Sequence, residues 1–215
     1  MKSIVILISG RGSNMEAIIN ASRAEKWPGK IVAVISNRAD AGGLAIASAA
    51  GIETVVLASK GQADREAYDQ RLREVIDQYS PDLIVLAGFM RILTASFVQY
   101  YEGRMINIHP SLLPAFRGLN THQRAIDAGV RIHGATVHYV SVEVDDGPIV
   151  AQAAVPVLPG DTEEVLAARV LDQEHRLYPQ VVKWVLEGKV KLEGNKVHLA
   201  SEISQPEQYA LLKGW

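Results

Sequence analysis

Several features that would direct the interpretation toward particular classes of protein are missing from this sequence. None of its 215 residues is a cysteine, which excludes disulfides, thiolate nucleophiles and cysteine-ligated zinc, and which fits a reducing compartment. The formal net charge is only −2, so the global charge does not favour nucleic acid or an anionic membrane as a partner. The apolar run Ile4–Ile8 is too short to span a membrane, and a glycine turn follows it instead of a signal-peptide cleavage site. We therefore expect a soluble cytoplasmic protein.

What is present is an ordinary globular composition, 48% hydrophobic and 21% charged. The length suits one large α/β domain with a full core better than two small domains. The chain contains no repeat, no low-complexity segment and no obvious linker. We therefore expect residues 1–215 to form a single domain.

In the N-terminal half, short β-branched runs alternate with helical patterns. Strands are expected at Ser3–Ser9, Ile31–Ser36, Glu53–Ala58, Leu83–Phe89 and 104–109. Helices are expected after the first strand, with Ser13 or Asn14 as the N-cap, and within residues 42–51 and 64–80. This alternation predicts an α/β fold with a Rossmann-like, mostly parallel sheet and helices on both of its faces.

In the C-terminal half the pattern changes. A helix is expected at 121–129, followed by strands at 133–144 and 147–157 that are separated by a short turn and are therefore antiparallel. A long helix is expected over 161–188, with a capping-box pattern at its start, a kink or a restart at Pro179, and an end at Gly188. A terminal hairpin follows, with Gly194-Asn195 at its turn.

The segment SGRGSN follows the first strand and opens a helix, which places backbone N–H groups and the positive end of the helix dipole where an anion can bind. It lacks the lysine of a Walker A loop and the third glycine of a dinucleotide-binding loop. The second strand ends in SNRAD, whereas an NAD-binding protein would be expected to have an acidic residue at the strand end to hold the ribose. The pattern favours a phosphomonoester over NAD. The alternative is a turn that needs glycine for its geometry alone.

The fifth strand, in MINIHPSLLPAFRG, carries polar residues at its carboxyl end. Asn107 and His109 project from one face of the strand, and Ile106 and Ile108 from the other. Parallel sheets are usually apolar on both faces, and α/β proteins bind ligands at the carboxyl ends of their strands. We interpret the pair as part of a site. The alternative is a histidine packed beneath the loop that Pro110 begins.

Other features support a site at this edge. The acidic turn offers Asp145, which would orient His109 and favour its imidazolium form if the two lie close together; Asp146 is the alternative. Arg91 follows the fourth strand, and the proline-bounded segment 110–120 suits a lid or a ligand wall. His138 is either a neighbour of the site or a core histidine. The six histidines show no metal-ligand spacing, so no metal is expected.

The motifs LISGRGSN, DREAYD, LAGFMRIL, NIHPSLLP, HGATVHYV and DQEH, in this order and spacing, resemble the phosphoribosylglycinamide formyltransferases, the glycinamide ribonucleotide transformylases of purine synthesis. NIHPSLLP alone would indicate only the wider family of folate-dependent formyl transferases and hydrolases. With this resemblance we expect a phosphate-binding Rossmann-like half at 1–103, a catalytic and folate-binding half at 104–190, and a terminal hairpin and tail at 190–215.

The resemblance implies transfer of the formyl group of 10-formyltetrahydrofolate to the glycyl amine of glycinamide ribonucleotide. The implied catalytic residues are Asn107, His109 and Asp145. The implied ribonucleotide-binding residues are Gly12, Ser13 and Asn14 for the phosphate and Glu174 for the ribose, although a glutamate in a long amphipathic helix is usually solvated. The implied folate-binding residues are Arg65, Met90, Arg91, Ile92, Leu93, Asn107, Val142, Glu143 and Val144.

These residue types suit direct transfer, with Asn107 and protonated His109 stabilising an oxyanion and Asp145 supporting the imidazolium. A formyltetrahydrofolate hydrolase and a methionyl-tRNA formyltransferase are disfavoured, because those proteins usually carry a further N-terminal or C-terminal domain. A nucleotide-binding regulatory module without catalysis is a third alternative. The expected partners are the two small molecules, with monomer and homodimer both left open.

Overall fold

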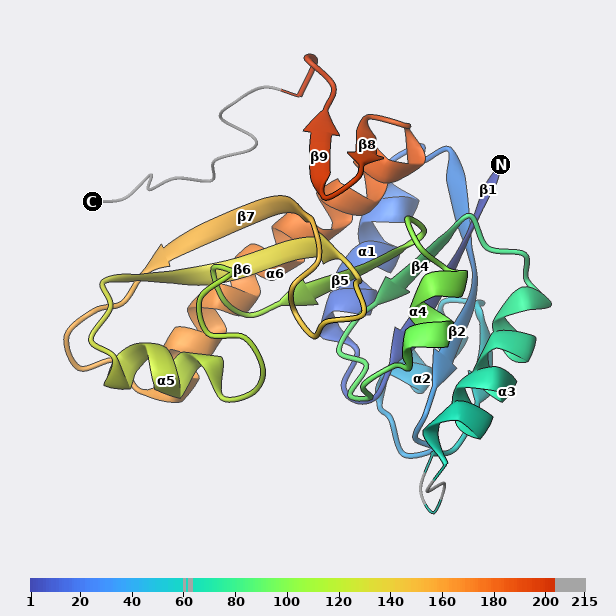
Figure 1. Ribbon diagram of the computed structural model, residues 1–215, viewed down its shortest axis with the longest axis horizontal. Helices are drawn as coiled ribbons and strands as arrows, with labels where there is room; N and C mark the ends of the chain where they lie inside the picture. The colour runs from blue at the N-terminus through green and yellow to red at the C-terminus, as the bar shows by residue number, and fades with distance from the viewer. Residues whose placement is uncertain (60, 62–63, 204–215) are drawn as a thin grey trace. The chain divides into compact units, whose positions relative to one another are not determined.

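The computed structural model describes residues 1–59, 61 and 64–203 (Figure 1). Its backbone groups into two compact units, Met1–Asn107 and Ile108–Trp215. The boundary lies within the fifth strand, close to the division that the sequence predicts after residue 103. The single domain and its three regions remain predictions, and part of the tail lies outside the described residues.

The first unit is built on parallel strands in the order β3-β2-β1-β4-β5. Their bounds are β1 Lys2–Ile8, β2 Gly29–Ser36, β3 Glu53–Val56, β4 Leu83–Leu86 and β5 Met105–His109. The apolar runs of β1 and β4 are buried, as expected for central strands covered on both faces. Two strands are shorter than the sequence predicts, because β3 ends before Leu57 and β4 ends at the turn around Gly88.

Helices connect these strands: α1 Ser13–Ala24, α2 Gly43–Ala49, α3 Arg65–Asp77 and α4 Ala95–Tyr100. The strand order reverses direction at β1 and β4, so right-handed crossovers place α1 and α2 on one face and α3 and α4 on the other. The contacts agree, since α1 touches α2 and α3 touches α4 (Figure 1). The carboxyl ends of β1 and β4 thus form the switch point at which doubly wound sheets bind ligands.

The second unit contains α5 Thr121–Asp127, β6 Ile132–Tyr139, β7 Ile149–Pro156, α6 Glu163–Leu186, β8 Val190–Glu193 and β9 Lys196–Leu199. The strands β6 and β7 are antiparallel, and α6 packs against both of them. The strands β8 and β9 form the expected terminal hairpin (Figure 1).

The connection between β6 and β7 is longer than the sequence predicts. The expected strand to Val144 is wrong, because β6 ends at Tyr139 and residues 140–148 form bends and turns. The Ser141 hydroxyl donates to the carbonyl of Glu143 at 2.8 Å, and such a local bond competes with strand pairing. The segment 142–146 is consequently a loop rather than the end of a strand.

The helix α6 runs without a break through Pro179, so the alternative of a restart at this residue is wrong. The N-cap is Thr162, whose hydroxyl accepts a hydrogen bond from the N–H of Val165 at 3.4 Å. Gly188 adopts the left-handed conformation just beyond the last turn, as expected for a helix end. No helix in the described ranges has the length and apolarity that a membrane crossing requires.

Candidate active site

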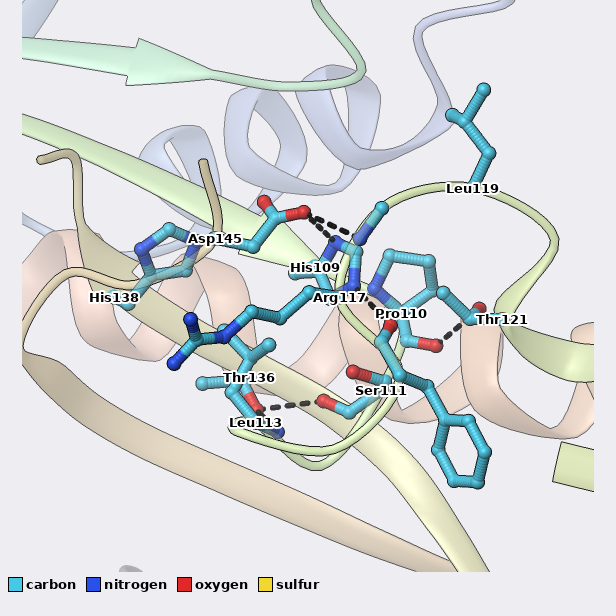
Figure 2. Close-up of polar contacts among 12 residues, drawn as sticks. His109, Pro110, Ser111, Leu113, Arg117, Leu119, Thr121, Thr136, His138 and Asp145 are labelled. Carbon is cyan, nitrogen blue, oxygen red and sulfur yellow. Dashed lines mark hydrogen bonds and ion pairs between the residues drawn. The ribbon is translucent and has the colours of Figure 1, made fainter. Parts of the chain in front are cut away.

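His109 ends β5 with its imidazole almost completely buried, the side chain being 7% exposed. Its Nε2 lies 3.0 Å from the carbonyl oxygen of Phe116 (Figure 2). Because a carbonyl can only accept, Nε2 carries a hydrogen. Its Nδ1 lies 3.4 Å from Oδ2 of Asp145. Both ring nitrogens therefore face oxygen acceptors.

Asp145 is the acid of the 145–146 pair that faces the histidine. Its backbone is left-handed, with φ of 54°, and its Oδ2 also accepts the N–H of Gly118 at 2.9 Å (Figure 2). Asp146 instead forms an ion pair with Arg117, and both of those side chains are more than one-third exposed. The sequence could not show whether Asp145 lies near His109, and in the second unit the two side chains face each other.

The segment 110–120 is anchored close to His109 by threonine side chains. Thr121 donates to the carbonyl of Pro110 at 2.6 Å, and Thr136 donates to the carbonyl of Ser111 at 2.7 Å (Figure 2). These bonds hold the loop so that the Phe116 carbonyl and the Gly118 N–H point at the His109–Asp145 pair. The segment expected as a lid or ligand wall thus contributes backbone groups to the site.

The other histidines near this pair have lowered pKa values, and two of them, His133 and His138, are buried. Burial lowers the pKa of His133 to about 4 and also lowers the pKa of His122. Burial likewise lowers the pKa of His138, whose Nδ1 donates to the carbonyl of Tyr139 at 2.8 Å. At neutral pH these rings add no positive charge around His109.

In the first unit, the expected phosphate loop leads directly into α1. The N-cap is Gly12 in the left-handed conformation, with φ of 77°, so the prediction of Ser13 or Asn14 as the N-cap is wrong. A Cβ at Gly12 would lie 2.8 Å from the Cα of Gly43, which only glycine avoids. Ser13 and Asn14 therefore form the first turn of α1, where their backbone N–H groups lie at the positive end of the helix dipole.

The segment Met90–Leu93 follows β4 and exposes apolar side chains. Met90 is 68% exposed and Ile92 is 58% exposed, whereas Leu93 is buried. The guanidinium of Arg91 lies over the ring of Tyr68, 4.0 Å from its centroid. Exposed apolar side chains beside a stacked cation form a surface suited to a flat, polar ring system.

The remaining predicted site residues are also placed. Arg65 is exposed at the first position of α3, and Asn107 is half-buried on β5. Val142 is 46% exposed and Val144 is 49% exposed, with exposed Glu143 between them in the β6–β7 connection.

Glu174 departs from the expectation for an amphipathic helix, because it is only 7% exposed on α6. A carboxylate is rarely buried unless it has a polar partner or a function. Burial of this residue could not be predicted from the helical pattern, in which glutamate is normally solvated.

Residues 2–182 match the family described as Formyl transferase. The chain belongs to the formyl transferase family. This formyl transferase is 50% identical over 208 residues to the phosphoribosylglycinamide formyltransferase of Escherichia coli strain K12, covering 97% of this chain and 98% of that protein. It is 47% identical over 192 residues to the trifunctional purine biosynthetic protein adenosine-3 of Bos taurus, covering 89% of this chain and 19% of that protein.

Comparison with solved structures supports the same family. Glycinamide ribonucleotide transformylase 1 of Symbiobacterium toebii matches the formyl transferase with a TM-score of 0.90 at 44% identity, covering 94% of this chain and 95% of that chain. The resemblance inferred from the motifs and the predicted α/β fold are both confirmed.

The formyl transferase also has site features that the sequence does not reveal. A cleft of about 510 Å³ borders Asp145 and is lined by Leu113, Pro114, Arg117, the turn 145–149 and the hairpin residues 195–198. The sequence predicts the hairpin, but no motif in it indicates that its residues line a cleft. The backbone groups of Phe116 and Gly118 were missed as well, since a backbone contact leaves no residue-type signal.

Within the described ranges, no group of His, Asp and Glu side chains could hold a metal ion.

Proposed function

We propose that this formyl transferase acts as a phosphoribosylglycinamide formyltransferase in de novo purine synthesis. It transfers the formyl group of 10-formyltetrahydrofolate to the glycyl amine of 5-phosphoribosylglycinamide, giving formylglycinamide ribonucleotide and tetrahydrofolate. The observation that carries this proposal is the high identity to the Escherichia coli enzyme over almost the whole of both chains. The His109–Asp145 pair supports it, because it suits acyl-type transfer without a covalent intermediate.

His109 acts as the proton donor and electrostatic stabiliser of the reaction. Asp145 lies at its Nδ1, where a carboxylate favours the imidazolium form and fixes the ring orientation. The Nε2–H then exchanges the Phe116 carbonyl for the carbonyl oxygen of the reacting group. Asn107, two positions earlier on β5, supplies an amide N–H to the same developing oxyanion.

The ribonucleotide is held by groups from different elements. The backbone of Gly12, Ser13 and Asn14 binds the phosphate, which the positive end of the α1 dipole supports. Glu174 accepts a hydrogen bond from the ribose, and its burial on α6 supports a role other than solubility.

The folate is held by the remaining residues of the predicted set, and the chemistry of the segment Met90–Leu93 fits it. Its exposed apolar side chains suit the flat faces of a pteridine, and its backbone can supply hydrogen bonds to the edge of that ring. Arg65 offers a cation to the carboxylates of the folate tail. The folate-binding residues are Arg65, Met90, Arg91, Ile92, Leu93, Asn107, Val142, Glu143 and Val144.

The proposed partners are the two small-molecule substrates, and neither nucleic acid nor a membrane is among them. We place the protein in the cytoplasm, as a monomer or a homodimer. Neither catalytic nor binding chemistry in this proposal requires a metal.

The proposal is tested by following deformylation of a 10-formylfolate co-substrate by absorbance, with and without glycinamide ribonucleotide. We expect loss of the formyl group only when the ribonucleotide is present. Turnover without the amine would identify a hydrolase, and absence of turnover with both substrates would refute the proposal.

A regulatory module without catalysis makes a different prediction for His109→Asn. We expect this variant to bind the ribonucleotide with a Kd within about threefold of the wild type and to lose turnover by about 10²-fold or more. Calorimetric titration gives the Kd and the deformylation assay gives the rate. Unchanged turnover would favour the regulatory module.

A further inference from the structure

Both ends of the segment Met90–Leu93 are fixed by side chains that have no role in the site described so far. The Met90 N–H donates to Oγ of Ser9 at 2.7 Å, and the Thr94 N–H donates to Oδ2 of Asp69 at 2.7 Å. Both acceptors are almost completely buried, Ser9 being 4% and Asp69 2% exposed. The segment is therefore held at two points by residues distant in the sequence.

Ser9 is itself fixed in orientation. It follows β1, its N–H donates to the carbonyl of Gly88 at 3.1 Å, and its hydroxyl hydrogen is donated to Oδ1 of Asn37. The Nδ2 of Asn37 in turn donates to Oγ of Ser59 at 3.1 Å. Because the only hydrogen of the Ser9 hydroxyl is used on Asn37, a lone pair of its oxygen is aimed at the Met90 N–H.

Asp69 is an unusual residue for its position on α3. A buried carboxylate is costly, and in the described part of the chain its Oδ1 has no hydrogen-bond partner. A serine or an asparagine could cap the Thr94 N–H at lower cost. The charged form makes a stronger bond to that N–H, which fixes the end of the segment more firmly.

Between these fixed ends, the backbone N–H and C=O groups are available for hydrogen bonding. Arg91, Ile92 and Leu93 make no backbone hydrogen bond to any of the residues that the structure describes. Their peptide groups can therefore bind a ligand that carries its own donors and acceptors. Fixing the ends in advance reduces the conformational entropy that such a ligand has to offset on binding.

We infer that Asp69 and Ser9 are positioning residues for the folate co-substrate. They hold the backbone of Met90–Leu93 so that its peptide groups are already in place when the folate binds. Neither residue touches the reacting atoms, so their loss weakens folate binding and leaves the chemical step intact. This inference rests on the proposed function.

The test measures binding of tetrahydrofolate, the folate product, by calorimetry. We expect Asp69→Ala to raise the Kd for tetrahydrofolate about tenfold, the scale of one lost charge-assisted hydrogen bond. The KM for the formyl-folate should rise in parallel, while kcat and the KM for the ribonucleotide stay within about twofold. Asp69→Asn should restore most of the affinity, because its amide oxygen still accepts the Thr94 N–H.

Amide hydrogen exchange supplies a readout that does not depend on activity. In Asp69→Ala the Thr94 amide should exchange faster than in the wild type. Ser9→Ala tests the other end of the segment, and it should speed exchange at Met90 and raise the Kd for tetrahydrofolate. It also keeps the inference testable should Asp69→Ala fail to fold.

Asp82→Ala is the matched control. Asp82 also accepts a backbone N–H through Oδ2, from Ser3 at 2.7 Å, but at the opposite end of β1. We expect this variant to bind tetrahydrofolate with the wild-type Kd. The inference is overturned if Asp69→Ala and Ser9→Ala bind tetrahydrofolate as the wild type does, or if Asp82→Ala weakens binding equally. A wild-type protein that does not bind tetrahydrofolate would overturn the proposed function itself.

Discussion

At the scale of single residues, the second unit surrounds His109 with acceptors. The Phe116 carbonyl and the Asp145 carboxylate face its two ring nitrogens. The buried rings of His133 and His138 stay neutral because burial lowers the pKa of each. These two rings therefore add no positive charge beside the residue that we propose as the proton donor.

The two adjacent acids should differ sharply on substitution. Asp145→Asn removes the charge that supports the His109 imidazolium, and we expect kcat to fall by about 10²-fold. Asp146→Asn loses only an exposed ion pair with Arg117, and we expect kcat within about threefold of the wild type. Steady-state kinetics of the two variants measures both kcat values and shows which acid supports catalysis. A larger loss in Asp146→Asn would move the proposed role to that residue.

At the scale of elements, short and irregular pieces within each unit carry several of the residues that we propose as functional. The left-handed Gly12 starts α1, the loop 110–120 reaches His109, and the connection after β6 presents Asp145. Each depends on a backbone conformation that an alternating or helical pattern does not encode. The long helices position these pieces and contribute proposed residues of their own, Ser13 and Asn14 on α1, Arg65 on α3 and Glu174 on α6.

The geometry of the proposed phosphate loop should be sensitive to one methyl group. In Gly12→Ala the new Cβ would meet the Cα of Gly43 at 2.8 Å, so the loop has to move and the KM for the ribonucleotide should rise about tenfold or more. Gly51→Ala is the control, because Gly51 also has a positive φ but has open space around it. It should cost about 1 kcal/mol of stability and leave the KM unchanged. An equal rise in KM for both variants would contradict a local effect.

Much of the element pattern was predictable, and the failures have physical reasons. The strands of the first unit and the helix α6 follow clear periodicities, so they were found. The helix α4 was not predicted, because six residues are too few to show an amphipathic period. Asn107 and His109 could be recognised because polar residues at the end of a buried strand are unusual. Asp69 could not, because an acid in an amphipathic helix gives no sign of burial.

At the scale of the whole molecule, buried histidines link stability to pH. His133 is 1% exposed and its pKa is lowered to about 4, below the ordinary value of about 6.5 in the unfolded chain. Between these values the unfolded state binds more protons, so stability is lost as the pH falls from about 6.5 toward 4.

His133→Gln should reduce this pH dependence. We expect the loss of unfolding free energy between pH 7 and pH 5 to be about 2 kcal/mol smaller in the variant than in the wild type. Urea unfolding at the two pH values measures it. His198→Gln, which changes a largely exposed histidine on β9, is the control and should leave the wild-type dependence intact. Equal slopes for His133→Gln and the wild type would refute this assignment.

The central claim is that the chain transfers a formyl group directly from a folate to an amine. The most direct measurement uses 10-formyltetrahydrofolate carrying an isotopic label in the formyl carbon, glycinamide ribonucleotide, and product separation by chromatography. We expect the label to appear on the glycyl nitrogen of the ribonucleotide, with one tetrahydrofolate formed for each labelled product. Label recovered only as formate, or only in the unreacted folate, would contradict it.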